Sequence, residues 1–512
     1  MIRIRSGDTV TELAWTGENI PAARLLAQAG LYPDYPCGGQ GRCGKCRVLA
    51  HGDLSPAAPE ELAQLPPREL ARGMRLACLA RICGPDAELT LPREDGLLVE
   101  TGGSLHRLEW DPWAAALGIC VDIGTTTVAA YLWDLDRRCR LGVASCKNPQ
   151  ERFGADVVSR LDASLAGQGD ALRACIVRCL SDLAYQLCRQ AGRPVSDVGG
   201  AVITGNTAML YLLRGYDVRD IALAPFQARH LFGESVPARE LGLDWGADCQ
   251  VYLPPCLSAY VGADITCGDI PHLSIHMQYA RGPALLADVG TNGEMALLSD
   301  GTIYCCATAA GPAFEGVGIS CGSAAVTGAI DAVTVENNAL RCHVIGGGTA
   351  RSLCGSGLLD AVAALRRLEL VEDSGYMEDD SLPLSGSVSL LRRDIRSFQL
   401  AKAAVCAGVD TLLRAAGRAA SEVETVWLAG GFGCKLSPDS AGAVGLLPRE
   451  LIPAVRPSGN TAAMGAALLL CSRRFEAETV SIAAAARLVD LSASPVFQQR
   501  FVEDMTLSEV TS

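Results

Sequence analysis

The sequence predicts a multidomain α/β (α+β) protein in which a cysteine-rich N-terminal part precedes a larger part with an internal repeat. A glycine-rich loop with three cysteines lies before residue 50. Residues 122–127, Asp-Ile-Gly-Thr-Thr-Thr, lie between two apolar runs and predict a hairpin turn between two strands. The pattern returns at 288–291 as Asp-Val-Gly-Thr, and strands and helices alternate from residue 117 onward.

Composition excludes several classes of function. The chain has 512 residues, and 44 Lys and Arg against 57 Asp and Glu give a net charge of -13. An acidic chain without basic clusters argues against nucleic acid and anionic membranes as partners. No apolar run approaches the roughly 18 residues that a membrane-spanning helix needs, and the N-terminus lacks a signal-peptide core. We therefore expect a cytoplasmic protein.

The 22 cysteines are expected to be reduced thiols or metal ligands rather than a disulfide framework. Three of them, Cys37, Cys43 and Cys46, share a ten-residue loop with four glycines, and Cys78 supplies a fourth. Glycines let the backbone curl around an inorganic core, while four thiolates complete two tetrahedral irons. A zinc site also needs four cysteines but usually pairs two short knuckles, so the spacing favours iron and sulfur. Cys83 is a less favoured fourth ligand.

This part of the chain resembles the 2Fe-2S ferredoxins, closer to the adrenodoxin type than to the plant type, because five residues separate the first two cysteines. The resemblance implies a β-grasp fold with a one-electron 2Fe-2S cluster held by Cys37, Cys43, Cys46 and Cys78. Apolar patterning adds a strand hairpin over 2–13 and a helix over 22–29. Residues 96–116 mix glycine, charge and two tryptophans, which is typical of a linker that docks at one end.

The two Asp-x-Gly-Thr turns are interpreted as phosphate-binding turns. Backbone N–H groups and Thr hydroxyls of such a turn can contact a phosphate, while Asp122 faces its magnesium ion. One turn alone would be weak, because Asp and Gly are ordinary hairpin residues. Two copies, at Asp122 and Asp288, suggest a duplicated fold that closes on a nucleotide.

Later segments add candidate ligand positions. A strand over 200–205 runs into Asn206-Thr207, which is either a ligand-facing loop or a helix N-cap. Helices are expected at about 170–192 and 400–415, and another over 460–471 in the core. The strand ending in Gly430-Gly431-Phe432 leaves bare backbone against which an adenosine can lie. Neither a P-loop nor a dinucleotide-binding glycine motif is present.

Two Asp-x-Gly-Thr hairpins with a late Leu-Ala-Gly-Gly-Phe-Gly resemble the actin, sugar kinase and heat-shock-chaperone ATPase superfamily. That resemblance implies two ribonuclease-H-like halves closing over ATP and Mg²⁺, with the two aspartates holding magnesium through water and orienting the attacking water. No basic partner for the γ-phosphate can be assigned. The implied site residues are Asp122, Gly124, Thr125 and Thr126 in the first phosphate site, Asp288, Gly290, Thr291, Asn292 and Gly293 in the second, and Gly430, Gly431 and Phe432 at the adenosine.

A ferredoxin placed before such an ATPase resembles the reductive activators of corrinoid proteins. The supporting motifs are Asn148-Pro-Gln with Gly-Ala-Asp156, Pro254-Pro with Val-Gly-Ala-Asp264, and the segment 311–316, Gly-Pro-Ala-Phe-Glu-Gly. Two features distinguish this chain from some or all members of that family. The chain has no cysteine after Cys471, so the variant with C-terminal 4Fe-4S centres is not expected. Residues 321–324 are Cys-Gly-Ser-Ala where the family has Met-Arg after a glycine.

The resemblance implies an ATP-dependent activator that transfers an electron from its cluster to the Co(II) corrinoid of a methyl-transfer protein and restores Co(I). The implied partners are that corrinoid protein and an upstream electron donor, in an anaerobic metabolism, and a homodimer is compatible with this reading. We expect a ferredoxin-like domain over 1–95, a linker over 96–116, a middle domain over 117–205 and an ATPase-like domain over 206–512.

Other functions remain open from the sequence. A redox-sensing ATPase would use the cluster to report oxidation and would not reduce a corrinoid. An activator of another low-potential metalloenzyme, such as a radical-type dehydratase, shares the ATPase superfamily but implies a 4Fe-4S cluster between subunits. A carbohydrate or acetate kinase would give the ferredoxin part no role.

Overall fold

The computed structural model describes residues 1–510 apart from 7–8, 16, 18, 30–45, 66, 92–109, 270–281 and 434–435. The chain forms two compact units, one made of residues 1–95 and 148–176 and the other of 96–147 and 177–512. Two of the expected cluster ligands, Cys37 and Cys43, lie outside the described residues. Across the described residues, no helix is both long and apolar enough to cross a membrane.

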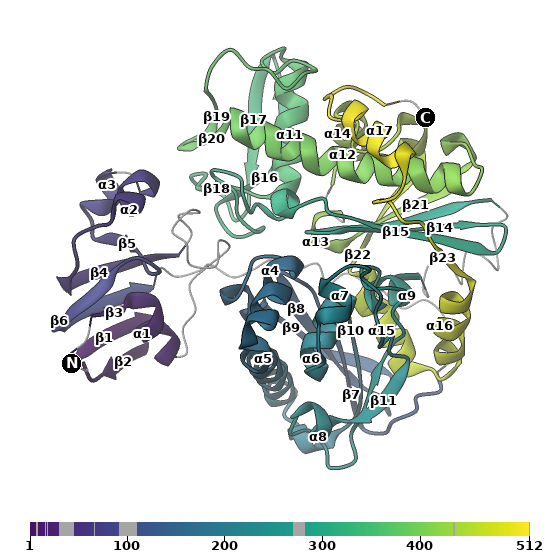
Figure 1. Ribbon diagram of the computed structural model, residues 1–512, viewed down its shortest axis with the longest axis horizontal. Helices are drawn as coiled ribbons and strands as arrows, with labels where there is room; N and C mark the ends of the chain where they lie inside the picture. Colours follow the sequence, from purple (N-terminus) through teal and green to yellow (C-terminus); the bar gives the residue numbers. More distant parts are fainter. Residues whose placement is uncertain are drawn as a thin grey trace. The chain divides into compact units, whose positions relative to one another are not determined.

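The N-terminal sheet has the strand order β2-β1-β6-β4-β5, with β3 paired to β6 (Figure 1). Its strands are β1 (Ile2–Ser6), β2 (Thr9–Leu13), β3 (Ile20–Pro21), β4 (Arg47–Leu54), β5 (Met74–Leu76) and β6 (Arg81–Leu91). The antiparallel β1–β2 hairpin and the helix α1 (Ala22–Gln28) confirm the expected hairpin and helix. Ile2 and Ile4 alternate with exposed arginines along β1, so one face of the strand enters the core with Leu25.

A buried ion pair joins β5 to a helix of this unit, three positions before Cys78. Arg75 in β5 donates from Nη2 to Glu61 Oε2 at 2.7 Å and from Nε to Oε1 at 3.0 Å. Glu61 lies in α2 (Pro59–Gln64), which α3 (Pro67–Leu70) follows, and also accepts from the Leu76 N–H at 2.8 Å. Burial opposes the charged form, yet the hydrogen bonds from Arg75 and the backbone outweigh it and lower the pKa of Glu61 below its ordinary 4.5.

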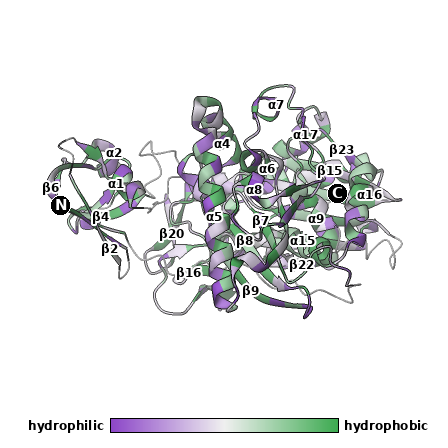
Figure 2. Ribbon diagram, turned by 90° about the horizontal axis from the view of Figure 1, so that it is seen from below, coloured by the Kyte–Doolittle hydropathy of each residue, from purple (hydrophilic) through white to green (hydrophobic). Residues whose placement is uncertain are grey.

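The first unit also contains residues 148–176. They form η1 (Pro149–Arg152), α4 (Val157–Ala163), the π-helix η2 (Ser164–Gln168) and the start of α5 (Gly169–Gln190). Two residues of the sequence motifs serve as caps here. Asn148 accepts from the Gln150 N–H at 3.0 Å and Asp156 from the Ser159 N–H at 2.7 Å, which satisfies orphan donors of the first turn. Hydrophilic and hydrophobic residues alternate along α5 (Figure 2), as expected of an amphipathic helix.

Two six-stranded sheets dominate the second unit (Figure 1). The first contains, in order, β11 (Glu234–Pro237), β12 (Gln250–Leu253), β10 (Val198–Gly205), β7 (Leu117–Ile123), β8 (Thr127–Asp134) and β9 (Cys139–Lys147). The second contains, in order, β22 (Val455–Gly459), β21 (Thr425–Ala429), β13 (Ala284–Val289), β14 (Gly293–Ser299), β15 (Thr302–Thr308) and β23 (Ala486–Leu488).

The central strands of the two sheets follow the same pattern. In the first sheet β7, β8 and β9 form an antiparallel meander and β10 runs parallel to β7. In the second, β13, β14 and β15 form the meander and β21 runs parallel to β13. Each Asp-x-Gly-Thr turn therefore joins the first two strands of a meander, and each turn aspartate lies beside the carboxyl end of a parallel strand. Asp122 pairs with Thr204 and Asp288 with Ala429.

Helices cover these sheets and small strands extend them. The apolar helix α15 (Thr461–Cys471) packs on β7, β10 and α9 (Ala263–Asp269), while α12 (Arg392–Ala415) packs on β14 and β15. The remaining helices are η3 (Val195–Asp197), α6 (Thr207–Arg214), α7 (Arg219–Ala222), α8 (Ala238–Leu241), η5 (Pro312–Glu315), α11 (Gly355–Arg367), η6 (Ala420–Glu422), α13 (Gly430–Gly433), α14 (Pro438–Ala443), η7 (Arg449–Ala454), α16 (Arg474–Ala485) and α17 (Pro495–Glu503). The remaining strands are β16 (Ala329–Glu336), β17 (Ala339–Val344), β18 (Ser352–Leu353), β19 (Ser381–Ser385) and β20 (Val388–Leu391).

The helices expected at about 170–192 and over 460–471 match α5 (Gly169–Gln190) and α15 (Thr461–Cys471), whereas a third expected helix is longer than predicted. The helix expected over 400–415 begins at Arg392, eight residues earlier. The reason is local capping: Asp394 accepts from the Leu391 N–H at 2.9 Å and from the Ser320 N–H at 2.8 Å, so a polar first turn is stable without an apolar period.

The described end of the expected linker docks on the second unit. Trp110 Nε1 donates to the Leu135 carbonyl at 2.8 Å, and Trp113 Nε1 donates to the Leu469 carbonyl at 3.0 Å.

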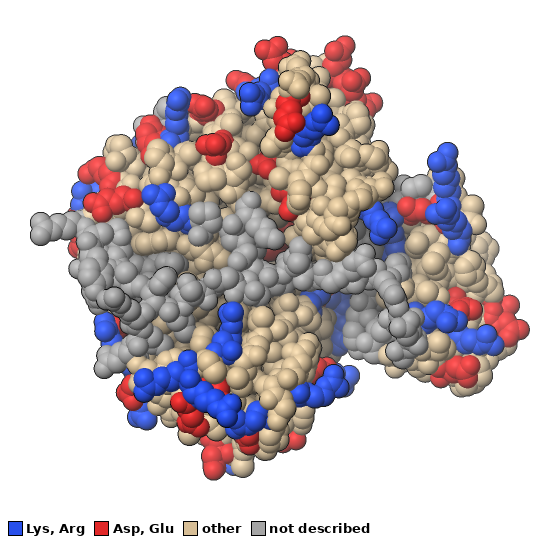
Figure 3. All heavy atoms as spheres, turned by 180° about the vertical axis from the view of Figure 1, so that it is seen from behind, with Lys and Arg blue, Asp and Glu red and all other residues tan. Residues whose placement is uncertain are grey.

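On the face drawn in Figure 3, the acidic and basic side chains of the described residues are interspersed.

Replacing Arg75 with Ala is expected to lower the free energy of unfolding by about 3–5 kcal/mol, because it leaves the Glu61 carboxylate buried without its partner. The matched control is Arg5→Ala, which removes an exposed pair with Glu88 and should lower it by less than about 1 kcal/mol. Denaturant titration of both variants measures the difference.

The loss of unfolding free energy in Arg75→Ala should depend on pH. Because the folded pKa of Glu61 is lowered, the stabilisation is present above its ordinary value of 4.5 and is lost as pH falls through the folded pKa. Equal stability of the Arg75 and Arg5 variants at neutral pH would contradict the role of the buried pair.

Candidate active site

The two Asp-x-Gly-Thr turns line one cavity of about 220 Å³ between the two sheets of the second unit. Its wall contains the expected nucleotide-site residues Asp122, Gly124, Thr125, Thr126, Asp288, Gly290, Thr291, Asn292, Gly430 and Phe432. The wall also contains residues from η5, α9, α11 and α15. The structure therefore brings together segments that are separated by more than 300 residues in the chain.

The first turn is closed by its own backbone and held by Asn206. The Gly124 N–H donates to the Thr127 carbonyl at 3.0 Å, and a Cβ on Gly124 would lie 2.7 Å from that oxygen, so the tight turn requires glycine. Asn206 Nδ2 donates to Thr125 Oγ1 at 3.2 Å. Asn206 also caps α6 by accepting from the Met209 N–H at 3.0 Å, so the expected N-cap is confirmed.

The second turn contacts Glu315. The Gly290 N–H donates to the Asn292 carbonyl at 2.9 Å. Glu315 Oε2 accepts from Thr291 Oγ1 at 2.6 Å and also from Thr126 Oγ1 of the first turn. The glycine at 293 has a packing reason of its own, because a Cβ there would lie 2.8 Å from Thr308 Oγ1.

Five acidic side chains line the cavity. Four of them are here named the cleft carboxylates, Asp122, Asp264, Asp288 and Glu294, and the fifth is Glu315. Desolvation raises the pKa of Asp122 to about 6, against a hydrogen bond donated by Asn460 Nδ2 at 2.8 Å. Desolvation and the charge of Asp122 raise the pKa of Asp264 to about 7. Desolvation and the charges of Asp264, Asp122 and Glu315 raise the pKa of Asp288 to about 8. The pKa of Glu294 also lies well above its ordinary value, mainly through burial.

The charges of the cleft carboxylates are not compensated by basic side chains. Of the described residues lining the cavity, none is Lys or Arg. The buried Oε1 of Glu294 has no hydrogen-bond partner. Such a donor set suits a hard divalent cation. Within the described parts of the chain, no three acidic, Cys or His side chains are arranged to ligate one ion directly. The cavity carboxylates themselves fit Mg²⁺, which binds through one or two carboxylates and keeps several of its waters.

Three helices direct their N-termini at the same cavity. Asn206 precedes α6, Cys354 precedes α11, and Asn460 precedes α15, and all three residues are in the cavity wall. Free backbone N–H groups and the helix dipole favour an anion at such ends. Gly355 has no space for a side chain, since a Cβ would lie 1.8 Å from the Phe314 carbonyl oxygen. The cavity thus combines helix ends that favour an anion with carboxylates that favour a cation.

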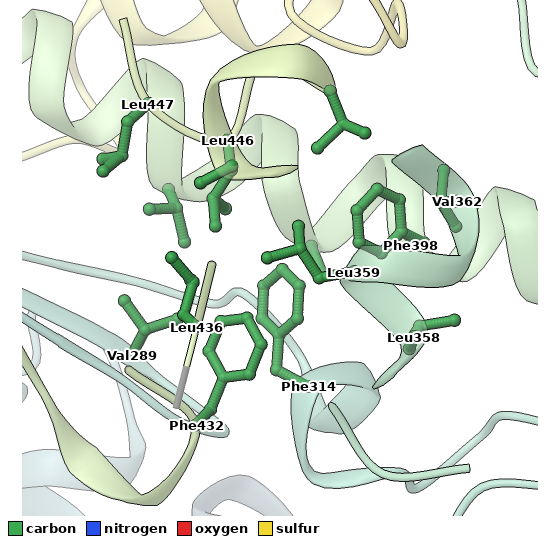
Figure 4. Packing of buried hydrophobic residues seen from close by; sticks show 14 of the residues in the cluster. Val289, Phe314, Leu358, Leu359, Val362, Phe398, Phe432, Leu436, Leu446 and Leu447 are labelled. Carbon is green, nitrogen blue, oxygen red and sulfur yellow. The ribbon is translucent and has the colours of Figure 1, made fainter. Parts of the chain in front are cut away.

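The glycine turn after β21 closes the cavity from the second sheet. Gly430 has φ +82°, and a Cβ there would lie 2.4 Å from Asp288 Oδ1, so the missing side chain makes room for the carboxylate. Phe432 lines the cavity, but its ring stacks on Phe314 with centroids 4.4 Å apart and the planes 14° apart. Figure 4 shows this pair beside Leu436 and Val289, which continues the hydrophobic core up to the cavity wall.

In the N-terminal unit the structure brings together the two described candidate cluster ligands. Cys46 Sγ and Cys78 Sγ lie 3.2 Å apart, although 32 residues separate them in the chain. Cys46 is buried and Cys78 half-buried. The Ala77 N–H donates to the Cys46 carbonyl at 2.7 Å, so the backbones that carry the two thiols are joined directly. Cys83 is exposed.

Comparison with known proteins adds a family to this geometry. A family model described as the C-terminal domain of RACo, the ASKHA domain, matches residues 282–512, and one described as the RACo middle region matches 117–278. The corrinoid activation enzyme RamQ of Eubacterium limosum is 31% identical over 418 residues, which are 75% of this chain and 69% of that protein. The chain belongs to the family of reductive activators of corrinoid proteins.

Two more similarities fit the family. The [Co(II) methylated amine-specific corrinoid protein] reductase of Methanosarcina barkeri is 25% identical over 391 residues, 70% of this chain and 71% of that protein. A solved structure titled reductive activator for corrinoid,iron-sulfur protein superposes with a TM-score of 0.72 at 26% identity and covers 99% of both chains. The C-terminal part of this corrinoid activator is thus an ASKHA-type domain.

Sequence reasoning missed four residues of the activator's cavity as site residues: Asp264, Glu294, Glu315 and Asn460. Asp264 and Glu315 lie in motifs that carried the family resemblance, so a signal was present without a role. Asn460 was assigned only to a core helix, and its contact with Asp122 spans 338 positions. Glu294 follows the second turn in β14, where alternation alone does not distinguish a site residue from a core position.

Gly430→Ala should destabilise the activator more than Gly301→Ala. Both positions have positive φ, 82° and 74°, so each substitution should cost about 1–2 kcal/mol of backbone strain. Only at 430 does the new methyl group meet Asp288 Oδ1, which should add about 1–3 kcal/mol, whereas at 301 nothing lies within 4 Å. Thermal unfolding of the two variants tests this, and equal midpoints would contradict the close approach.

Proposed function

We propose that this chain is an ATP-dependent reductive activator that delivers one electron to the Co(II) corrinoid of a methyl-transfer protein and so restores Co(I). The observation that carries the proposal is the presence, in a member of the corrinoid-activator family, of a cysteine pair at 3.2 Å in one unit and a cavity with two phosphate-type turns in the other. The family relatives act, by their names, on corrinoid proteins.

The proposal assigns a role to each part of the chain. Residues 1–95 are a β-grasp ferredoxin domain, 96–116 a linker, 117–205 a middle domain and 206–512 an ATPase-like domain. The mixed sheet of the N-terminal unit supports the first assignment. The order shared by five strands of each large sheet, a three-stranded meander followed by two further strands, supports duplicated ribonuclease-H-like halves.

The proposed cluster is of the 2Fe-2S type, held by Cys37, Cys43, Cys46 and Cys78. The described pair fits such a group, because two thiols of different segments converge beside the buried Glu61–Arg75 pair. When bound, the cluster supplies one electron at a time. An upstream donor must return that electron after each transfer. A homodimer remains part of the proposal only as a compatible assembly.

The proposed nucleotide site is the cavity of the second unit. Asp122 and Asp288 hold Mg²⁺ through water and orient the attacking water, and Asp264 and Glu294 add negative charge beside them. Thr125, Thr126, Thr291 and Asn292 bind phosphate oxygens, aided by the helix N-terminus at Asn206. The backbone at Gly430, Gly431 and Phe432 borders the adenosine. When bound, ATP with Mg²⁺ supplies the free energy of phosphate transfer to water.

Coupling requires the nucleotide to distinguish between states of the complex with the corrinoid protein. A ligand shifts an equilibrium only by its difference in affinity for the two states. Because the two turns belong to different sheets, a nucleotide that contacts both will favour one arrangement of the sheets. We propose that this arrangement alters the ligation of the corrinoid and allows the electron to be delivered.

The direct test follows loss of the Co(II) absorbance of a corrinoid protein mixed anaerobically with the reduced activator, with ATP and without it. The proposal predicts faster loss with ATP for the wild type. In Asp288→Asn the increase in this rate caused by ATP should be about tenfold smaller, since the substitution removes one carboxylate from the cation site. The control is Asp300→Asn, on the exposed turn between β14 and β15. Equal rates with and without ATP would refute the coupling.

The cluster assignment is tested separately by EPR spectroscopy of the reduced protein under anaerobic conditions. We expect a rhombic 2Fe-2S signal that is lost or strongly altered in Cys78→Ala and retained in Cys83→Ala, because only Cys78 lies against Cys46. The Cys83 variant is a matched control five residues away. A diamagnetic protein that contains zinc, or loss of the signal only in the Cys83 variant, would overturn the assignment.

A further inference from the structure

Glu315 connects the two turns of the cavity through one carboxylate. Its Oε2 accepts from Thr126 Oγ1 in the β7–β8 turn and from Thr291 Oγ1 in the β13–β14 turn. Its Oε1 accepts from the Thr291 N–H at 3.1 Å. Glu315 lies at the end of η5, which belongs to neither turn. A single side chain therefore links the two sheets where the cavity lies.

The groups that donate to Glu315 are those that the proposed function gives to phosphate. Carboxylate and phosphate oxygens are both anionic acceptors and take charge-assisted hydrogen bonds from the same hydroxyl and N–H donors. A hydroxyl has only one proton to donate, so neither Thr126 nor Thr291 can donate to Glu315 and to a phosphate at once. A nucleotide phosphate that uses these donors must displace the Glu315 carboxylate.

The surrounding chain is built to hold the Glu315 carboxylate at this place. A Cβ on Gly290 would lie 3.1 Å from Glu315 Oε1, so the glycine of the second turn leaves the carboxylate its room. The preceding residue, Phe314, is buried and stacks on Phe432, which anchors η5 in the core. Gly316 has φ +78°, and a Cβ there would lie 2.4 Å from the Ser323 backbone. The backbone at Glu315 is thus fixed by its neighbours on both sides.

We propose that Glu315 is an internal phosphate mimic that bridges the two turns in the nucleotide-free protein and is displaced by the terminal phosphates of ATP. This inference rests on the proposed nucleotide site and adds a regulatory step to it. Entry of the phosphates exchanges one link between the sheets for another, so the sheets remain joined but through the nucleotide. Release of phosphate returns Thr126 and Thr291 to Glu315.

The first test measures ATP affinity of the full-length holoprotein by isothermal titration calorimetry. Glu315→Gln keeps the size of the side chain and removes the competing charge, so its ATP dissociation constant should fall about tenfold. The matched control is Glu336→Gln on the exposed face of β16, which should leave the constant unchanged. Adenosine lacks phosphates, so its affinity should be the same in both variants and the wild type.

The second test measures amide hydrogen exchange in the nucleotide-free protein over the peptide 285–297. The Thr291 N–H should exchange several-fold faster in Glu315→Ala than in the wild type, because its acceptor is removed. Addition of ATP should bring the two proteins to the same exchange rate. Unchanged exchange in the variant would overturn the bridge.

The outcomes separate this inference from the function on which it rests. If the wild type binds no ATP, the nucleotide site fails, while the exchange experiment still decides whether Glu315 bridges the turns. If the wild type binds ATP and Glu315→Gln binds it equally or more weakly, the displacement is wrong. Tighter binding of ATP without any change for adenosine supports it.

Discussion

The architecture of the second unit depends on holding four carboxyl groups against one cavity. Asp122 and Asp288 come from corresponding positions of two sheets that share the order of five strands, and Asp264 and Glu294 come from α9 and β14. Desolvation raises the pKa of all four, and repulsion by neighbouring carboxylates raises it further at Asp264, Asp288 and Glu294. A cation bound there would relieve that repulsion and favour the charged form of each carboxyl group.

The N-termini of three helices favour an anion in the same cavity. Asn206, Cys354 and Asn460 precede helices whose N-termini meet at the cavity, and Asn460 also donates to Asp122. The cavity is therefore prepared for an anion and a cation at the same time, which is the charge pattern of a nucleotide with magnesium. The carboxylate of Glu315 accepts from the hydroxyls of Thr126 and Thr291 in the same cavity.

Local chemistry explains which parts could be predicted from the sequence. The turn at Asp122 could be predicted because its glycine and the two flanking strands follow one another directly in the sequence. The turn at Asp288 could be predicted because it repeats the same pattern. The β1–β2 hairpin and the helix α15 followed from apolar patterning alone. These features depend on short stretches of chain, where residue spacing determines backbone conformation.

Long-range convergence explains what could not be predicted. The donation from Asn460 to Asp122 and the bridge from Glu315 to Thr126 join residues 338 and 189 positions apart. Both residues have an ordinary local role, as a helix cap and as the end of a short helix, which conceals the second role. The early start of α12 was missed because capping by Asp394 replaces an apolar period.

The central claim is that the nucleotide and the corrinoid protein each shift the same equilibrium between two conformations of this chain. Such coupling is reciprocal, so each ligand must change the affinity of the other by the same factor. The most direct measurement is therefore the ATP dissociation constant of the activator with and without a saturating Co(II) corrinoid protein. The account predicts a change of about fivefold or more, matched by the effect of ATP on corrinoid-protein binding. Identical ATP affinities under the two conditions would contradict it.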